Sequence, residues 1–350
     1  MKVGVLTFHR CINYGSYWQA RCLVEGLCGL GHEAKLLDHD DVVARKAEWR
    51  NAFQPRLPVR TSRDDIARYG SKARRFIEAF DALPESARFD LNHPWDAEPQ
   101  DAVVIGSDEV WNFGHPWYGW KPAFFGDFLR AERRIAYAAS FGSHDAGRGI
   151  HPDWAAKLER FDAISVRDAN SRELVQASIG RDPAVVLDPV LQFPPAEPGP
   201  SERGSYAAVY GHGFPDWFVR HLREWATRRG LPLVSIGYRN EWADEQAIEL
   251  APQDFPDLIA NAGAVATNFF HGCVFALRYD RPFVCASSEY SRNKLRDLTD
   301  KVGAERHLVD EATGQVAFAQ LLDHPLDPAI AQRIDGLRAQ SSAFLASALG

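Results

Sequence analysis

Residues 103–112, VVIGSDEVWN, join an apolar run to a group of side chains that could bind or process a polar ligand. The group comprises Ser107, Asp108, Glu109, Trp111 and Asn112. In open α/β sheets, ligands bind beyond the carboxyl ends of the strands. The segment therefore predicts a buried strand that opens onto a site. The alternative is a plain strand followed by a helix that Ser107 or Asp108 caps, which leaves Trp111 and Asn112 unexplained.

A second candidate follows the first apolar run, in residues 7–16, TFHRCINYGS. A glycine before a helix, here Gly15, lets the backbone approach a ligand, and the N–H groups and dipole of the helix attract an anion. Asn13 and Gly15 are therefore candidates for binding an anionic donor. The segment lacks a G-x-G-x-x-G pattern, so it does not imply a dinucleotide. The alternative is an ordinary turn formed by Asn13 and Gly15.

A cation, Arg167, stands at the end of the apolar run in residues 162–168, DAISVRD. Its five fixed donors and permanent charge suit a phosphate or a carboxylate. The alternative is a salt bridge to Asp168 or to another acid. Arg292 and Lys294 belong to a basic turn that could also hold an anionic group, although such runs are more often solvated surface.

Residues 264–277, AVATNFFHGCVFAL, predict a strand and then a helix that begins near Gly272, with His271 at the helix N-terminus. A histidine there could exchange a proton near neutral pH or donate to a phosphate oxygen. Gly272 could bring the helix backbone close to the donor. The alternative is a buried or capping histidine. A weaker signal is His212 in residues 210–213, YGHG, at another strand end.

Short β-branched runs alternate with helical stretches along the chain, which is typical of βα units and a parallel sheet. The runs predict strands over residues 2–8, 34–38, 102–106, 134–140, 163–166, 185–187, 206–210, 233–236, 264–267, 283–287 and 307–309. Helical patterns occupy residues 16–30, 63–80, 154–161, 216–229, 255–261, 311–322 and 328–349. Basic residues on the helix over 63–80 indicate a solvated stripe or a surface that faces a membrane-bound acceptor.

Residues 193–204, FPPAEPGPSERG, contain four prolines and two glycines and predict a linker. We expect an α/β fold with two Rossmann-like domains that face a cleft. The first covers residues 1–195 and the second residues 205–327, and the helix over 328–349 returns to the first domain.

Bulk properties exclude several classes of function. The chain has 350 residues and a net charge of -7, which argues against nucleic acid as a partner. It has no apolar run of the roughly 18 residues that would span a membrane. Its first residues, MKVGVLTFHR, resemble a strand rather than a signal peptide. Five cysteines without C-x-x-C spacing predict reduced thiols of a cytoplasmic protein and no metal site.

Together these segments resemble the polysaccharide pyruvyl transferase family. The resemblance rests on residues 3–20, 103–112, 136–142 (AYAASFG), 163–168, 185–191 (VVLDPVL), 267–277 and 294–298 (KLRDL). Their order and spacing match from residue 3 to about residue 300. The resemblance implies a fold similar to GT-B glycosyltransferases and transfer of pyruvate from phosphoenolpyruvate onto a sugar as a cyclic ketal, with no further cofactor.

The same resemblance implies roles for single residues. Arg167 matches an arginine that contacts the donor, and His271 matches a histidine held to act in catalysis. Asp108 or Glu109 is then the candidate base for the sugar hydroxyl. Donor binding falls to Arg167, Gly272, Asn13, Gly15, Arg292 and Lys294, and acceptor binding to Trp111 and Asn112.

The chain departs from the family at Phe269. Other members carry Arg-Leu-His-Gly or Ser-Phe-His-Gly where this chain has Phe269-Phe270-His271-Gly272, which removes a polar contact to the donor. Two alternatives therefore stay open: a GT-B-like glycosyltransferase that uses a nucleotide sugar, and a non-catalytic member that binds a glycan or a protein. A lipid-linked acceptor, association with the inner face of the membrane and a homo-oligomer also stay open.

Overall fold

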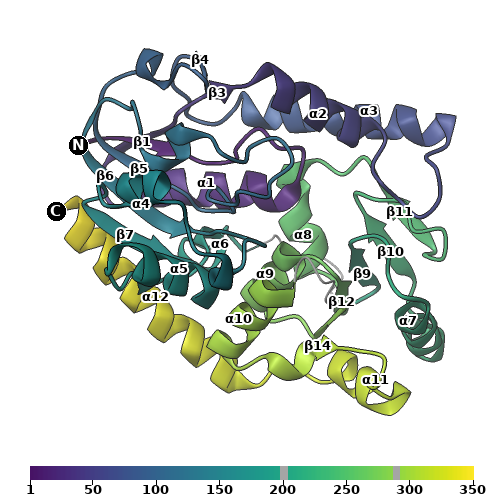
Figure 1. Ribbon diagram of the computed structural model, residues 1–350. Coiled ribbons are helices and arrows are strands. Elements are labelled where there is room, and N and C mark those ends of the chain that lie inside the picture. Colours follow the sequence, from purple (N-terminus) through teal and green to yellow (C-terminus); the bar gives the residue numbers. More distant parts are fainter. Residues whose placement is uncertain (198–203, 287–291) are drawn as a thin grey trace. The chain divides into compact units, whose positions relative to one another are not determined.

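The computed structural model describes residues 1–197, 204–286 and 292–350 (Figure 1). The chain divides into two compact units, and each is α/β with a six-stranded parallel sheet. The first unit comprises Met1–Glu48, Phe80–Pro194 and Asp335–Gly350, and the second comprises Trp49–Ala79 and Pro195–Ile334. Residues 198–203 of the predicted linker and residue 287 of a predicted strand lie outside the described residues.

The sheet of the first unit has the strand order β2-β1-β5-β6-β7-β8. Its strands are β1 (Lys2–Leu6), β2 (Glu33–Leu36), β5 (Gln100–Ile105), β6 (Ala131–Ala139), β7 (Ala163–Val166) and β8 (Ala184–Val185). A separate pair is formed by β3 (His39–Asp40) and β4 (Phe89–Asp90). The helices are α1 (Tyr14–Gly29), α4 (Pro152–Leu158), α5 (Ala169–Ile179), α6 (Pro189–Gln192) and the short 3₁₀ helices η1 (Pro94–Asp96), η2 (Pro122–Phe125) and η3 (Ala146–Arg148).

The sheet of the second unit has the order β11-β10-β9-β12-β13-β14. Its strands are β9 (Ala207–Tyr210), β10 (Leu233–Ile236), β11 (Glu245–Ala247), β12 (Ala264–Thr267), β13 (Phe283–Ala286) and β14 (Leu308–Val309). The helices are α3 (Arg63–Phe80), α7 (Asp216–Arg229), α8 (Phe255–Ala260), α9 (Phe270–Arg278), α10 (Arg292–Val302), α11 (Gln315–Asp323), η4 (Pro252–Asp254) and η5 (Glu305–His307). Two further helices have residues in both units, α2 (Val42–Phe53) and α12 (Pro328–Leu349), and the last residue of α3, Phe80, falls in the first unit.

Each sheet reverses its strand order at one place. In the first unit β1 pairs with β5, and in the second β9 pairs with β12, so the chain winds outward in both directions from these pairs. Ligands of doubly wound sheets bind at such switch points, beyond the carboxyl ends of the strands. The segments that follow β1, β5, β9 and β12 are therefore the candidate ligand-binding segments.

Helix α3 belongs to the second unit although it precedes most of the first unit in sequence. Arg68 donates to Glu249 Oε1 over 3.0 Å, and Asp65 accepts two bonds of 2.6 Å from Arg239. The hydroxyl of Tyr69 accepts from the backbone N–H of Arg239. The expected boundary at residue 195 would have assigned α3 to the first domain, whereas the structure groups this helix with the second unit. How far either unit folds as an independent domain stays a prediction.

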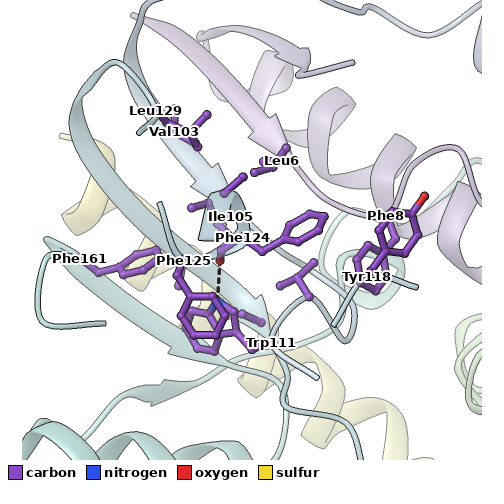
Figure 2. Packing of buried hydrophobic residues seen from close by; sticks show 14 of the residues in the cluster. Leu6, Phe8, Val103, Ile105, Trp111, Tyr118, Phe124, Phe125, Leu129 and Phe161 are labelled. Atoms are coloured by element: carbon purple, nitrogen blue, oxygen red, sulfur yellow. Dashed lines mark hydrogen bonds between the residues drawn. The ribbon is translucent and has the colours of Figure 1, made fainter. Parts of the chain in front are cut away.

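The core of the first unit is rich in aromatic side chains around the segment that follows β5 (Figure 2). Phe124 and Phe125 of η2 are buried, and the ring of Trp111 stacks on that of Phe125 with 5.7 Å between centroids. The indole N–H of Trp111 donates to the carbonyl of Phe124 over 2.7 Å. Residues 107–121 form turns and no α-helix, so this packing, rather than a helix cap, holds the segment in place.

Candidate active site

The switch point of the first unit joins the ends of β1 and β5. The hydroxyl of Thr7 donates to the carbonyl of Ser107 over 2.9 Å, and that of Ser16, in the first turn of α1, donates to Asp108 Oδ2 over 2.9 Å. Asp108 has a φ of 75°, a region that few non-glycine residues adopt. Such backbone outliers cluster at functional sites. The structure thus brings together two segments that were singled out separately in the sequence.

The two candidate carboxylates differ in exposure. The Asp108 side chain is 14% exposed. Glu109 is buried, and its Oε2 accepts from Asn112 Nδ2 over 2.8 Å. Asn112 is buried too, and its Oδ1 accepts from the N–H of Gly114. Asp108 is therefore the carboxylate better placed to meet a substrate, while Glu109 and Asn112 bond to one another.

Arg167 follows β7 and is buried among acids. Its Nη1 lies 2.9 Å from Asp188 Oδ2, and its Nη2 lies 3.7 Å from Asp108 Oδ1. Burial lowers the pKa of Arg167, but the nearby carboxylates, Asp188 first, outweigh it and raise the pKa overall. Asp188 is therefore the acid with which Arg167 forms the salt bridge that the sequence offered as the alternative. Contact between Arg167 and a donor stays a prediction.

Asp168 does not form the ion pair that the sequence offered as the first alternative. Its Oδ1 accepts from the N–H of Ser171 over 2.7 Å and so caps α5. Its Oδ2 accepts from the hydroxyl of Ser140 over 2.6 Å. Asp168 therefore fixes the end of β6 to the start of α5.

The expectation that Asn13 and Gly15 offer free N–H groups to an anion is wrong. Helix α1 begins at Tyr14, so Gly15 lies within its first turn. Asn13 is the N-cap, and its Oδ1 accepts from the N–H of Gly15 over 2.8 Å and from that of Ser16 over 3.2 Å. The cap occupies the donors that an anion would need.

The predicted acceptor contact of Trp111 also needs correction. The side chain is almost fully buried, and its ring packs against Phe125 and Phe161 (Figure 2). It also packs against Phe141. Because its N–H is bonded inside the core, the ring offers no face for a sugar. Trp120, by contrast, is 54% exposed and stacks on Phe113.

The switch point of the second unit joins the ends of β9 and β12. The hydroxyl of Thr267 donates to the carbonyl of Tyr210 over 2.6 Å. Helix α9 begins at Phe270, so His271 lies in its first turn, as the sequence predicted, with the helix two residues longer. The His271 ring is buried and packs edge-on against Phe270, with 5.2 Å between centroids.

Gly272 has a packing role at the start of α9. Its N–H donates to the carbonyl of Phe269 over 3.1 Å. A Cβ at this position would lie 2.0 Å from Oγ1 of Thr267. The glycine therefore lets α9 lie close against the end of β12. Contact between its backbone and a donor stays a prediction.

An aromatic cluster surrounds Phe269 at the same edge. Its ring packs against those of Tyr210, His212 and Tyr238, with centroids 5.1, 5.4 and 5.6 Å away. His212 and Tyr238 also contact each other at 4.9 Å. His212 follows β9 and Tyr238 follows β10, so three neighbouring strand ends contribute to this cluster.

A buried cation, Lys72, contacts a member of that cluster. It lies on α3, and its Nζ donates to the carbonyl of Gly237 over 3.0 Å and lies 4.4 Å from the centre of the Tyr238 ring. Lys72 is only 3% exposed, and burial lowers its pKa to about 7. Burial and the charge of Lys72 together lower the pKa of His212.

Arg292 and Lys294 lie in the first turn of α10. Arg292 is exposed and Lys294 is half-buried. Ser291, which opens the predicted basic turn, lies outside the described residues. Their contact with a donor stays a prediction.

Among the described residues, one group could offer three ligand atoms to a metal ion: His9, Asp38 and Glu85, whose atoms lie within 4.8 Å of one another. Arg10 donates to Asp38 over 2.5 Å and to Glu85 over 2.7 Å, and Arg88 also donates to Asp38. These guanidinium groups already neutralise the carboxylates, so the group is better explained as an ion-pair network.

The two parallel sheets, each with its own switch point, define an α/β protein built from two Rossmann-like units. The chain resembles UDP-GlcNAc 2-epimerase from Methanocaldococcus jannaschii at 8% identity, with 98% of this chain and 100% of that chain covered and a TM-score of 0.50. It also resembles E. coli heptosyltransferase WaaC (15% identity, 82% and 87% covered, TM-score 0.41) and the glycosyltransferase SnogD from Streptomyces nogalater (14%, 99% and 99%, 0.43).

The model of the polysaccharide pyruvyl transferase family matches residues 13–290. The chain belongs to this family, which indicates a pyruvyl transferase with a saccharide acceptor. A comparison with curated proteins returned no match. In the part of the chain that the structure describes, we find no helix with the length and hydropathy to cross a membrane.

Proposed function

We propose that the protein transfers a pyruvyl group from phosphoenolpyruvate to a saccharide and closes a ketal on two of its hydroxyls. Family membership, with His271 on the first turn of the helix at the second switch point, carries this proposal. The reaction needs a proton donor for the methylene carbon of the donor and a base for a hydroxyl. Histidine and aspartate suit these two tasks.

The charges at the two switch points favour an assignment of the substrates. Phosphoenolpyruvate carries a phosphate and a carboxylate, and the second unit places Lys72, His212 and His271 at its carboxyl edge. The first unit surrounds Arg167 with acids, which suit hydroxyl groups better than an anion. We therefore assign the donor to the second unit and the acceptor to the first.

This assignment must account for Phe269, which cannot form a polar contact with the donor. By the family resemblance, its ring stands where other members carry a polar residue. Both this ring and the ammonium of Lys72 contact the ring of Tyr238. We assign to Lys72 the positive charge that attracts the donor anion. Arg292 and Lys294 are further candidates for donor contact in the same unit. Donor contact by Arg167, which the sequence predicted, is the alternative to this assignment.

In the proposed chemistry, His271 protonates C3 of the donor while a sugar hydroxyl adds to C2 and loses its proton to Asp108. The C2–O bond to phosphate then breaks, and inorganic phosphate leaves with the electron pair and takes up the proton that Asp108 had accepted. A second hydroxyl adds to C2, and its proton returns to His271. The sum is one phosphoenolpyruvate and two hydroxyls giving one ketal and one phosphate. We place this reaction in the cytoplasm.

The test is an assay of the purified chain with phosphoenolpyruvate and a panel of saccharides, lipid-linked ones included. Acceptor-dependent phosphate release, with a ketal methyl signal in the NMR spectrum of the product, supports the proposal. Parallel reactions contain nucleotide sugars. Turnover of these alone indicates a glycosyltransferase, and glycan binding without any turnover indicates a non-catalytic member.

A further inference from the structure

The segment Trp49–Ala79 has a charge opposite to that of the whole protein. It contains eight arginine or lysine residues and three acidic ones, in a chain whose net charge is -7. Two of the cations are engaged inside the second unit, Arg68 with Glu249 and Lys72 with Gly237. The other six are exposed, and within the described residues none of them forms an ion pair: Arg50, Arg56, Arg60, Arg63, Arg74 and Arg75.

Three of these arginines surround one hollow. Arg56, Arg60 and Arg63 line a cavity of about 730 Å³ in the loop between α2 and α3, residues 54–62, and at the start of α3. Its remaining walls include the apolar side chains of Leu57 and Ile66. A hollow with guanidinium groups and apolar walls fits a phosphate group that is attached to a hydrocarbon. One guanidinium group can donate two parallel hydrogen bonds to two oxygens of a phosphate, and the apolar walls suit the hydrocarbon.

Exposed apolar side chains stand beside the same loop. Val59, between Arg56 and Arg60, is 54% exposed. Trp49, near the end of α2, is 39% exposed, and its ring stacks on Phe53 with 5.7 Å between centroids. Tryptophan and aliphatic residues among basic ones are typical of surfaces that lie at the headgroup level of a membrane. A purely ionic partner such as nucleic acid would not explain the exposed Trp49 and Val59.

We propose that the loop 54–62, with the adjoining ends of α2 and α3, docks the protein on an anionic membrane surface and that its arginines hold a lipid phosphate. The docking does not depend on the identity of the donor. It would bring the protein to the surface where a lipid-linked saccharide is found. Each arginine near an anionic surface contributes about a fivefold increase in binding.

The test uses the full chain and flotation with vesicles of phosphatidylcholine alone or with added phosphatidylglycerol. We expect binding to the anionic vesicles only, and its loss at high salt. The double variant R56A/R60A should bind about 30-fold more weakly. The matched control R220A/R228A removes two exposed arginines of α7 and should bind like the wild type.

Because all four arginines are exposed, both variants should keep the melting temperature of the wild type. Equal binding to both kinds of vesicle, equal binding by R56A/R60A, or no binding to vesicles would overturn the proposal. Binding to heparin or nucleic acid without vesicle binding would also overturn it. None of these outcomes affects the phosphate-release assay with soluble acceptors, so the two proposals fail independently.

Discussion

The carboxyl edges of the two sheets occupy the same topological position and carry opposite chemistry. In the first unit, Asp108 and Asp188 face Arg167. In the second unit, His271 lies on the first turn of α9, and Lys72 lies behind the ring of Tyr238. The fold supplies the place in both cases, and the loops decide which charge it carries. The contrast predicts measurable effects of single substitutions at both edges.

The largest effect should come from His271→Gln. If the second edge supplies the proton, kcat for pyruvyl transfer should fall about 10²–10⁴-fold while the fold is kept. Phosphate release and the melting temperature measure the two effects. His324→Gln, an exposed histidine that follows α11, is the control. Full activity of His271→Gln would remove this residue from the chemistry.

Arg167→Ala should lower the free energy of unfolding by about 3–5 kcal/mol, because it leaves the buried Asp188 without its cation. Chemical denaturation measures this change. Arg172→Ala, which removes an exposed ion pair with Asp182, should have little effect. The KM for phosphoenolpyruvate then sharpens the contrast between the edges. A rise would support donor contact by Arg167, and an unchanged KM would leave it as the cation that holds the acidic edge.

Lys72→Met should stabilise the protein and weaken the binding of phosphoenolpyruvate. The pKa of Lys72 is about 7 in the folded state and 10.5 in its ordinary state, so the unfolded chain binds more protons between these values. Wild-type stability should therefore rise with pH from about 7 to 10.5, and the variant should lose that slope. Near neutral pH and below we expect a gain of about 2–4 kcal/mol.

Melting curves across this pH range test the stability effect, and the KM for phosphoenolpyruvate tests the function. Lys72→Arg should keep the KM near that of the wild type because it keeps the charge. If Lys72→Met has the KM of the wild type, the charge of Lys72 plays no part in donor binding.

The sequence predicted the fold well because burial makes a clear pattern. The strands over 163–166, 233–236 and 264–267 and the helices over 63–80, 216–229 and 328–349 were confirmed to the residue. Strand β11 was missed because Glu245–Ala247 is a short edge strand that contains no fully buried residue. Helix α2 was missed because its residues lack an apolar stripe.

The site was harder to predict because side chains can bond to each other instead of to a ligand. Asn13 signalled a helix cap as much as a binding loop, and only the structure shows its oxygen on the N–H of Gly15. Lys72 was treated as surface, although it falls at helical spacing with the buried Tyr69 and Phe76. That spacing was the available signal. The contact partner of Lys72, Gly237 at the end of β10, lies 165 positions away in the sequence, and no local pattern reveals such a contact.

The smallest effect should come from Trp111→Phe. The change leaves the carbonyl of Phe124 without its donor and opens a small space, so unfolding should become easier by about 1–3 kcal/mol. Trp120→Phe, at an exposed position, should leave stability almost unchanged. Because Trp111 is buried, its loss should not alter the KM for a saccharide. A higher acceptor KM with unchanged stability would restore the aromatic contact that the sequence predicted, and the first edge would then bind its ligand by stacking as well as by its carboxylates.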